Sequence, residues 1–376
     1  MIKKTFKIPL FLIVLIFFSA CSSKRFVLNV EQHPKNNGNI AKNIIAPPVM
    51  VKKIINIDDM EYKTPVFVGA GSIIAGNKDG EIYVVSINNY KLRWRLDLGE
   101  PIQAKIYADK FIYAGTLAGN LYKISFSKKI LWKKYLGYPI AGSIKKVKDR
   151  LYVTTENNAL YCINSNNGDI IWKFSKDYNM LSIRGVSSVL DKDGIYLGFN
   201  DGTISKLSEN GDQIWEAEMG KGTLFVDVDA EPKNSGDKIF AASVNGYIEA
   251  LDKNSGDVIW KRKISGYSNI AIGEFVLFIA DNGGNILAMD SSSGEVLWKK
   301  KISNKVNVYA LHLSGDYLYA IDNHGTLVAL DSLSGKIMDI KHISGEFDSN
   351  FSAYKGRLYI ISRGGTIYTI YSRSEK

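Results

Sequence analysis

Residues 245–264 read NGYIEALDKNSGDVIWKRKI, and this stretch contains the unit from which the chain is built. An Asn-Gly turn signal comes first, followed by an alternating strand, a second turn at Ser255-Gly256-Asp257, and a short strand that carries Trp260. The unit returns about every 40 residues, and self-similarity at this period on short strands is typical of a β-propeller.

The first turn of the unit can be followed through eight repeats. It stands at Asp79-Gly80, Ala118-Gly119, Asn157-Asn158, Asp201-Gly202, Asn245-Gly246, Gly283-Gly284, His324-Gly325 and Gly364-Gly365. Nearly all of these dipeptides contain residues that tolerate a positive φ, so we predict two-residue hairpin turns of the primed types. The sequence therefore predicts an all-β fold, an eight-bladed β-propeller with four-stranded antiparallel blades.

Every Trp of the chain occupies one position of the unit, at the start of its last strand. These residues are Trp94, Trp132, Trp172, Trp215, Trp260 and Trp298. A ring of this size can wedge against the neighbouring blade and bury about 150 to 250 Å², so we interpret them as structural docking residues rather than as a binding surface. The seventh repeat has Asp339 at this position and the eighth ends before it, which predicts weaker docking of these two blades.

The eighth repeat lacks a last strand, because only residues 372–376 follow the strand from Ile367 to Tyr371. Upstream of the first repeat, residues 49–57 read VMVKKIINI and resemble the last strands of other repeats. We predict that this N-terminal strand completes the C-terminal blade and closes the ring. Closure removes the exposed sheet edges that invite aggregation.

The N-terminus has the features of an export signal. Three Lys residues precede an apolar run from Ile8 to Phe18 that only Pro9 interrupts, and Phe18-Ser19-Ala20-Cys21 resembles a bacterial lipobox. We therefore expect a lipoprotein signal peptide in residues 1–20, a flexible tether from a lipidated Cys21 in residues 21–44, and the propeller in residues 45–376. A plain signal peptide followed by a free Cys is the alternative.

The residue after Cys21 is Ser22, and no Asp follows to indicate retention in the inner membrane. By resemblance, the expected location is the periplasmic face of the cell outer membrane, where acyl chains anchor the protein. The formal net charge is +10, but Lys and Arg are spread over strands and turns, as on a solvated surface. Nucleic acid is an implausible partner for an exported protein.

The remaining Cys and His residues indicate no redox or metal chemistry. If lipid occupies Cys21, Cys162 has no disulfide partner, and its place in an alternating strand predicts a buried small side chain. His33 falls in the tether, and His312, His324 and His342 fall in separate strands or turns. We predict no metal site.

Motifs for catalysis are also missing. Gly69-Ala70-Gly71 with Gly76 has the wrong spacing for a dinucleotide-binding loop, and no Walker loop, Ser nucleophile elbow or paired-Cys spacing occurs. The acidic run 227–231 resembles the start of a calcium loop, but Pro232 and Lys238 stand where Gly and Glu are needed. We predict no enzyme activity and no cofactor.

Two irregular segments lie between neighbouring repeats. One contains Leu181, Ile183 and Arg184, and the other, in an unusually long repeat, contains Asp227 and Asp229. Apolar anchors beside charges of both signs suit a protein-binding hot spot. Strand residues with ordinary loop solvation are an equally acceptable interpretation of the same pattern.

The lipobox, the Trp-bearing repeats of the quinoprotein-like type, LSIRG at 181–185 and DVD at 227–229 together resemble the BamB family, the lipoprotein propellers of the outer-membrane β-barrel assembly (BAM) complex. The resemblance covers essentially the whole chain from Cys21. It implies a non-enzymatic scaffold that binds a POTRA domain of BamA through Leu181, Ile183, Arg184, Asp227 and Asp229. It also implies aid in inserting barrel proteins, with contact to unfolded outer-membrane protein precursors.

Two other classes of protein share parts of this pattern. A periplasmic dehydrogenase that depends on pyrroloquinoline quinone has a Trp-docked eightfold propeller, but it needs a calcium site, a catalytic Asp and commonly a vicinal Cys pair, none of which the sequence offers convincingly. A cell-wall-binding propeller would bind glycan or peptide through its central funnel.

Overall fold

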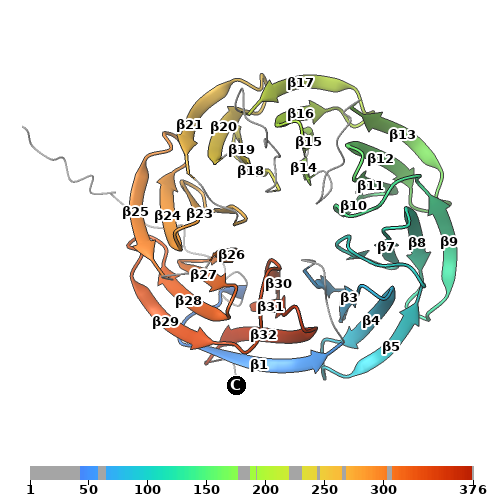
Figure 1. Ribbon diagram of the computed structural model, residues 1–376, viewed down its shortest axis with the longest axis horizontal. Coiled ribbons are helices and arrows are strands. Elements are labelled where there is room, and N and C mark those ends of the chain that lie inside the picture. The colour runs from blue at the N-terminus through green and yellow to red at the C-terminus, as the bar shows by residue number, and fades with distance from the viewer. Residues whose placement is uncertain are drawn as a thin grey trace, which may run out of the picture.

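The computed structural model describes residues 43–57, 65–176, 187–191, 193–219, 231–243, 246–264, 268–302 and 307–374. Within these residues the chain forms eight four-stranded antiparallel sheets, which stand side by side in a ring with one strand of each sheet on the outer rim (Figure 1). The predicted eight-bladed β-propeller is therefore confirmed.

In each of blades 1 to 4, the four strands follow one another along the chain from the innermost to the outermost strand. Blade 1 comprises β2 (Phe67–Gly69), β3 (Ser72–Gly76), β4 (Glu81–Ser86) and β5 (Leu92–Asp97). Blade 2 comprises β6 (Tyr107–Ala108), β7 (Ile112–Gly115), β8 (Asn120–Ile124) and β9 (Ile130–Tyr135). Blade 3 comprises β10 (Ile144–Val147), β11 (Arg150–Thr155), β12 (Ala159–Asn164) and β13 (Ile170–Ser175). Blade 4 comprises β14 (Ser187–Asp191), β15 (Gly194–Gly198), β16 (Thr203–Leu207) and β17 (Gln213–Glu218).

Blades 5 to 7 repeat this order, and blade 8 takes its outer strand from the other end of the chain. Blade 5 comprises β18 (Lys233–Ser235), β19 (Lys238–Ser243), β20 (Tyr247–Asp252) and β21 (Val258–Lys263). Blade 6 comprises β22 (Ala271–Ile272), β23 (Val276–Ala280), β24 (Asn285–Asp290) and β25 (Val296–Lys301). Blade 7 comprises β26 (Val308–Ser314), β27 (Tyr317–Asp322), β28 (Thr326–Asp331) and β29 (Ile337–His342). Blade 8 comprises β30 (Ser352–Tyr354), β31 (Arg357–Ile361), β32 (Thr366–Ser372) and β1 (Val49–Asn56).

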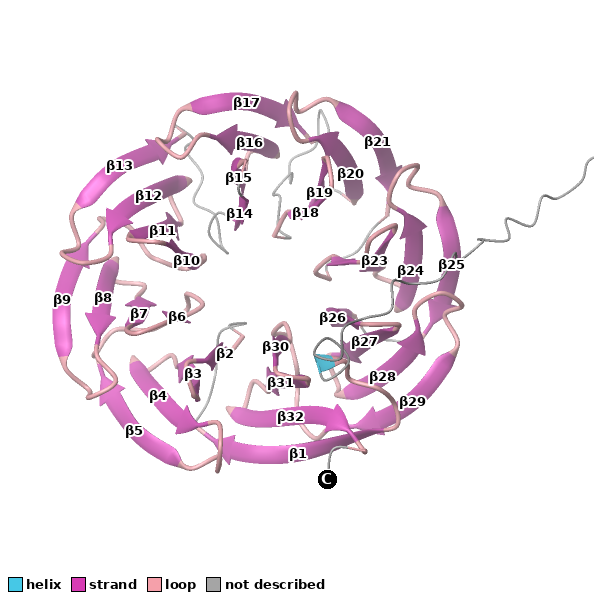
Figure 2. Cartoon of the chain, turned by 180° about the vertical axis from the view of Figure 1, so that it is seen from behind, coloured by secondary structure: helices cyan, strands magenta, loops and turns pink. Residues whose placement is uncertain are grey.

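The N-terminal strand closes the ring as predicted. β1 pairs antiparallel with β32, with Val49 opposite Ser372 and Asn56 opposite Thr366. Seen from behind, β1 lies on the rim beside β32, between β29 and β5 (Figure 2). The two outer strands of blade 8 thus come from opposite ends of the chain, and hydrogen bonds hold them together.

The residues just before β1 fasten this closure to blade 7 as well. The Ile45 amide donates to Ser314 Oγ at 2.9 Å, and the Tyr319 hydroxyl donates to the Ile45 carbonyl at 2.9 Å. Ile45 itself is buried in a cluster that joins blades 7 and 8. We refer to residues 43–57 as the latch, because they bind both blades at the point where the ring closes.

The core lies between the blades. Middle strands such as β3 and β12 are buried along nearly their whole length, whereas outer strands such as β5 alternate between exposed and half-buried residues. A middle strand meets a neighbouring blade on each face, so it reads as a continuous apolar run, while an outer strand has one face in water. The hydrophobic clusters accordingly span two blades, as where Phe240 of blade 5 packs in one cluster with Leu277 of blade 6.

The predicted type of the repeated turn is wrong. Where both residues of the first turn are described, only the second has a positive φ, as Gly80 does at 91° while Asp79 does not. The Asn77 amide donates to the Glu81 carbonyl at 3.1 Å and the Gly80 amide to the Asn77 carbonyl at 3.3 Å, so three residues, 78–80, lie in the loop. A three-residue loop needs a left-handed residue only at its end.

A polar side chain just before the loop stabilises this turn. It is the feature of the sequence from which the three-residue loop could have been predicted. Asn77 Oδ1 accepts the amides of Asp79 and Glu81 at 3.1 and 2.8 Å. Asp281 and Asp322 take the same place in blades 6 and 7 and accept the corresponding amides. Asn and Asp side chains commonly satisfy backbone amides two residues ahead in this way.

We expect Gly325→Ala to lower the free energy of unfolding by at least about 2 kcal/mol. Gly325 has a φ of 86°, and a Cβ there would lie 1.9 Å from the Ile343 carbonyl oxygen. The preceding turn residue of blade 8 provides a matched control, because Gly364 has no heavy atom within 4 Å of such a Cβ. Urea unfolding followed by Trp fluorescence should separate the two variants, and equal losses would contradict this account of the turn.

Candidate partner-binding site

The six indoles reach from one blade to the next. Each Nε1 donates to a main-chain carbonyl in the turn that precedes the next blade's outer strand, at distances between 2.9 and 3.4 Å. The acceptors are, in order, Phe126, Ser165, Glu209, Lys253, Ser291 and Ser332. Each Trp is therefore paired with a turn that lies more than 30 residues further along the chain.

In five of these six turns a Gly lies against the ring. Gly168, Gly211, Gly256, Gly294 and Gly335 all have a positive φ, and a Cβ at any of them would lie 2.7 to 3.2 Å from the indole of the preceding blade. Each stands four residues before the Trp position of its own repeat, so the sequence carried the pattern. The sequence of a single repeat does not indicate that the Gly contacts the Trp of the previous blade.

The two seams without Trp use polar contacts. Asp339 stands at the Trp position of blade 7, where Oδ2 accepts the Val49 amide at 2.8 Å. In blade 8 the position falls on Lys52, which lies opposite Thr369, and its ammonium lies 5.2 Å from the centre of the Tyr90 ring in blade 1. Weaker docking at these seams stays a prediction.

The residues predicted to bind a partner flank blade 4. Leu181, Ile183 and Arg184 belong to the connection between β13 and β14, and Asp227 and Asp229 belong to the connection between β17 and β18. All five, like Cys21, lie outside the described residues. The described ends of both connections are alike, since each leaves an outer strand and enters the innermost strand of the next blade.

Lys176 is the last described residue before the first connection. Its ammonium lies 2.8 Å from Asp201 Oδ2 and 2.9 Å from Glu216 Oε2, both in blade 4. Burial alone would raise the pKa of Asp201, but the hydrogen bonds from Lys176 and Thr203 outweigh it and lower this pKa. These contacts attach the end of the blade 3 rim strand to blade 4.

Glu231 is the first described residue after the second connection. One carboxylate oxygen pairs with Lys145 of β10 in blade 3, and the other lies 2.8 Å from Lys233 of β18 in blade 5. Burial by itself would raise the pKa of Glu231, but the charges and hydrogen bonds of the two lysines outweigh it and hold the pKa at about 2. This carboxylate is ionised at neutral pH and links the innermost strands of blades 3 and 5.

Polar contacts cross the seam between blades 4 and 5 in both directions, with donors from each blade. The Lys253 carbonyl accepts hydrogen bonds from the buried Lys206 ammonium at 2.9 Å and from the Trp215 indole at 3.1 Å. The Lys253 ammonium in turn pairs with Asp191 and, at 3.3 Å, with Asp193 of blade 4. The ion pairs of Lys176 and Glu231 thus form a frame that joins blades 3, 4 and 5 at the described ends of both connections, and a rigid support of this kind positions side chains for binding.

Groups that could support chemistry are few in the described part of the chain. No three His, Cys, Asp or Glu side chains among the described residues are placed to hold a metal ion. Burial lowers the pKa of His312 to about 4, so its imidazole is neutral at pH 7. Cys162 is fully buried as predicted, and burial raises the pKa of its thiol to about 11.

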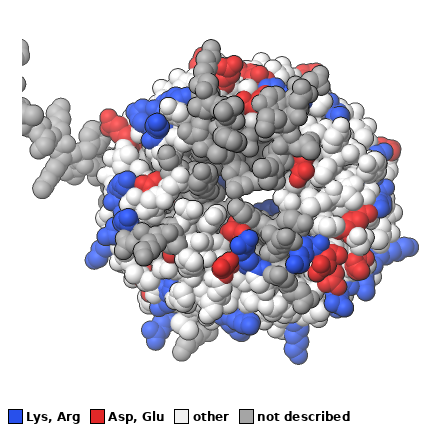
Figure 3. All heavy atoms as spheres, in the orientation of Figure 1, with Lys and Arg blue, Asp and Glu red and all other residues white. Residues whose placement is uncertain are grey.

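Charged side chains of both signs are interspersed around the rim of the face shown in Figure 3. The described part of the chain contains no helix whose length and apolar character would suit a membrane crossing. Taken together, the ring, its docking Trp residues and its ion-paired frame define a Trp-docked eight-bladed propeller of the quinoprotein-like type.

Comparison with known proteins narrows this class. The sequence profile of the outer membrane protein assembly factor BamB matches residues 78–300 and 283–374. The chain therefore belongs to the BamB family. The BamB of Shewanella oneidensis is 23% identical over 292 residues, which cover 71% of this chain and 73% of that protein.

Solved structures agree on the fold. The crystal structure of BamB from Moraxella catarrhalis superposes with a TM-score of 0.76 at 19% identity and covers 86% of this chain and 100% of that one. The quinohemoprotein alcohol dehydrogenase from Comamonas testosteroni gives a TM-score of 0.68 at 12% identity, over 90% of this chain and 78% of that one. At these identities each likeness concerns the fold alone.

Proposed function

We propose that this chain is a non-enzymatic scaffold in the assembly of outer-membrane β-barrel proteins. The observation that carries the proposal is the family match, which runs from residue 78 to residue 374 and so includes strands of every blade. The relatives matched by sequence are named as assembly factors rather than as enzymes. Lipid on Cys21 would hold the ring at the periplasmic face of the outer membrane, at the end of a tether that ends near the latch.

The partner in this proposal is a POTRA domain of BamA, and the binding residues are those on either side of blade 4. Leu181 and Ile183 would serve as apolar anchors, Arg184 as a donor to partner carboxylates or carbonyls, and Asp227 and Asp229 as acceptors for partner Lys or Arg. The frame supports this assignment, because Lys176 and Glu231 attach the described ends of both connections to blades 3, 4 and 5. Anchors on a rigid support lose little entropy on binding.

Arg184→Glu combined with Asp229→Lys is expected to abolish co-purification with the barrel-assembly subunit. Reversing two charges replaces attraction by repulsion at the interface, and loss of a well-buried contact typically costs 2 kcal/mol or more in binding. The measurement is affinity purification from detergent-solubilised membranes, together with crosslinking from position 184 to identify the partner. The melting temperature should stay nearly unchanged.

Lys305→Glu provides the matched control, because Lys305 belongs to the connection between β25 and β26, which joins blades 6 and 7 and does not adjoin blade 4 in the chain. This variant should co-purify like the unchanged protein. Retained co-purification of the double variant would remove the assigned residues. A crosslink from position 184 to a protein outside barrel assembly would remove the proposed function itself.

A further inference from the structure

Three lysines from three blades meet near the centre of the ring. Lys145 stands on β10 and Lys233 on β18, the innermost strands of blades 3 and 5, and Lys105 lies just before β6 of blade 2. The innermost strands surround the centre of the ring (Figure 2), where the space-filling view shows an opening (Figure 3). We call Lys105, Lys145 and Lys233, together with Glu231, the inner lysine cluster.

The backbone places Lys105 and Lys145 on one face. Lys105 lies between two buried apolar residues and pairs with Ser143 in a parallel bridge that joins blades 2 and 3. Because successive residues of an extended chain point to opposite faces, Lys145 shares the face of Ser143, and the buried Ile144 points the other way. The two lysine side chains therefore leave the core between the blades on the same side.

The cluster contains one carboxylate for three ammonium groups. Glu231 pairs with Lys145 through one oxygen, and its other oxygen lies 2.8 Å from the Lys233 ammonium. The Lys105 ammonium has no ion pair and no hydrogen-bond partner among the residues that the structure describes. Two positive charges of the cluster are thus in excess.

This excess changes the acidity of the lysines. Burial lowers the pKa of Lys105, the charge of Glu231 opposes this effect, and the charges of Lys145 and Lys233 add to it. Burial also lowers the pKa of Lys145, again against the effect of Glu231 and with a contribution from Lys233. Like charges enclosed by a protein of low polarity attract a counter-ion more strongly than the same charges in water. An anion at this place would reduce their repulsion and accept hydrogen bonds from them.

We propose that the inner lysine cluster binds a phosphate group, either free or at the end of a larger molecule. A phosphate monoester carries a charge of about −1.5 to −2 at neutral pH and three strong acceptor oxygens. This charge matches the excess of the cluster, and ammonium groups from separate blades can donate to different oxygens of one tetrahedral group. A single carboxylate would leave one positive charge without compensation. Binding needs only the folded ring and is independent of the assembly role proposed above.

The test is a calorimetric titration of the mature chain with sodium phosphate at constant ionic strength. We expect a Kd of about 1 mM or lower, and acetate, with its single charge, should bind at least about tenfold more weakly. Glycerol 1-phosphate distinguishes the two sources, because equal affinity supports a phosphate on a larger molecule and weaker affinity supports the free ion. Equal binding of phosphate and acetate, or no binding of phosphate below about 10 mM, overturns the proposal.

Two substitutions in the cluster have opposite expected effects. Lys105→Gln removes a positive charge and should weaken phosphate binding about tenfold, whereas Glu231→Gln removes the competing carboxylate and should strengthen it about tenfold. A merely structural role of these residues would weaken binding in both variants. Unchanged binding in Lys105→Gln overturns the proposal, as does weaker binding in a Glu231→Gln chain that melts like the unchanged protein.

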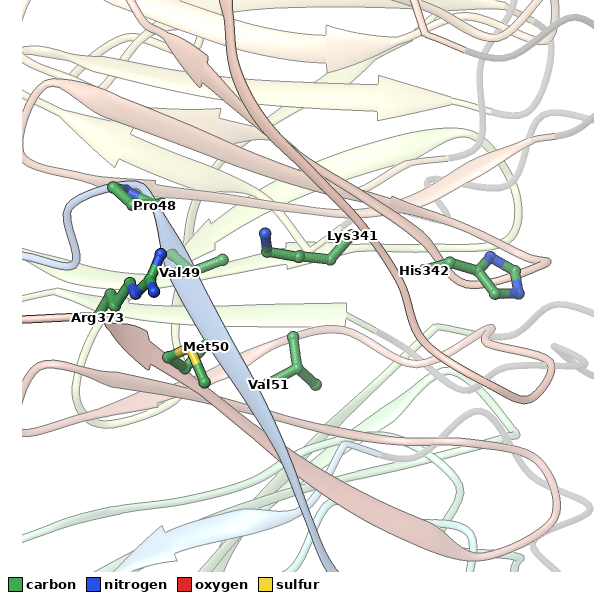
Figure 4. Close-up of a pocket in the computed structure, with 7 residues that line it drawn as sticks. All are labelled: Pro48, Val49, Met50, Val51, Lys341, His342 and Arg373. Carbon is green, nitrogen blue, oxygen red and sulfur yellow. The ribbon is translucent and has the colours of Figure 1, made fainter. Parts of the chain in front are cut away.

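Arg373→Gln is the matched control, because it removes one positive charge from a different part of the ring. Arg373 lines a hollow beside the outer strands β1 and β29 (Figure 4), and its amide donates to the Pro48 carbonyl at 3.0 Å. Phosphate affinity should be unchanged in this variant. A tenfold loss would show that phosphate responds only to the overall charge and would overturn the assignment to the cluster.

The acidic run 227–231 ends in the cluster, and its carboxylates are the alternative occupant. If Asp227→Asn combined with Asp229→Asn raised the phosphate affinity more than tenfold, the chain's own carboxylates would compete for the same lysines. That result would overturn the proposal of a phosphate ligand.

Discussion

Removal of the latch, residues 43–57, is expected to abolish cooperative folding of the whole ring. The deletion breaks seven residue pairs between β1 and β32 and exposes the edge of blade 8. It also removes Ile45, Val49 and Ile57, each at most 2% exposed. Burial of such side chains contributes about 1.5 to 3 kcal/mol each, so their loss alone approaches the total stability of about 5 to 15 kcal/mol that is typical of a domain.

Thermal unfolding followed by circular dichroism is the measurement. Since the truncated chain will lack a cooperative transition, a synthetic peptide of residues 43–57 added in trans keeps the result interpretable. The peptide should restore a cooperative transition, and a scrambled peptide of the same composition should not. A truncated chain that melts at the temperature of the full protein would show that blade 8 does not need its outer strand.

Trp260→Ala is expected to lower the free energy of unfolding by about 3 to 5 kcal/mol. The indole is 6% exposed, its ring lies 5.9 Å from that of Phe240, and its Nε1 donates to the Ser291 carbonyl at 3.1 Å. The change therefore leaves a cavity between blades 5 and 6 and an unpaired carbonyl beside it. Urea unfolding monitored by circular dichroism avoids the loss of a fluorophore.

Ile259→Ala is the control for this prediction. Ile259 precedes Trp260 on the same strand, but its side chain is 43% exposed, so the loss should stay near 0.5 kcal/mol. If both variants lost the same amount, the Trp would contribute only strand propensity and not contact between blades.

Much of the fold could be predicted because the repeat unit occurs eight times in the sequence. The turn residues, the alternating strand and the Trp recur at one spacing, so an ambiguous copy such as Asn157-Asn158 is resolved by its seven counterparts. The closing strand could be predicted because blade 8 is one strand short at its C-terminal end. The turn type could not, since positive φ at Gly80 is compatible with several loop lengths and only the hydrogen bonds around Asn77 decide among them.

The candidate site was less accessible from the sequence. Nothing in the residue types of Leu181 or Asp227 distinguishes a binding loop from a solvated one, and the assignment depended on resemblance to a family. No pattern in the sequence predicted the ion-paired frame. Lys145 and Glu231 lie 86 positions apart in the chain, and no local pattern indicates that two such residues form an ion pair.

The sequence by itself determined the number of blades and the order of strands, because these depend on turn chemistry and alternation within about 40 residues. It also determined the strand that closes the ring, because the eighth repeat lacks a last strand of its own. Only the tertiary structure decided which partner each docking residue meets. Asp339 and the Val49 amide are 290 positions apart, and they come together only when the two ends of the chain share one blade. The missing turn between β32 and β1 has the same origin, since a closed ring made from a linear chain must leave one turn unmade.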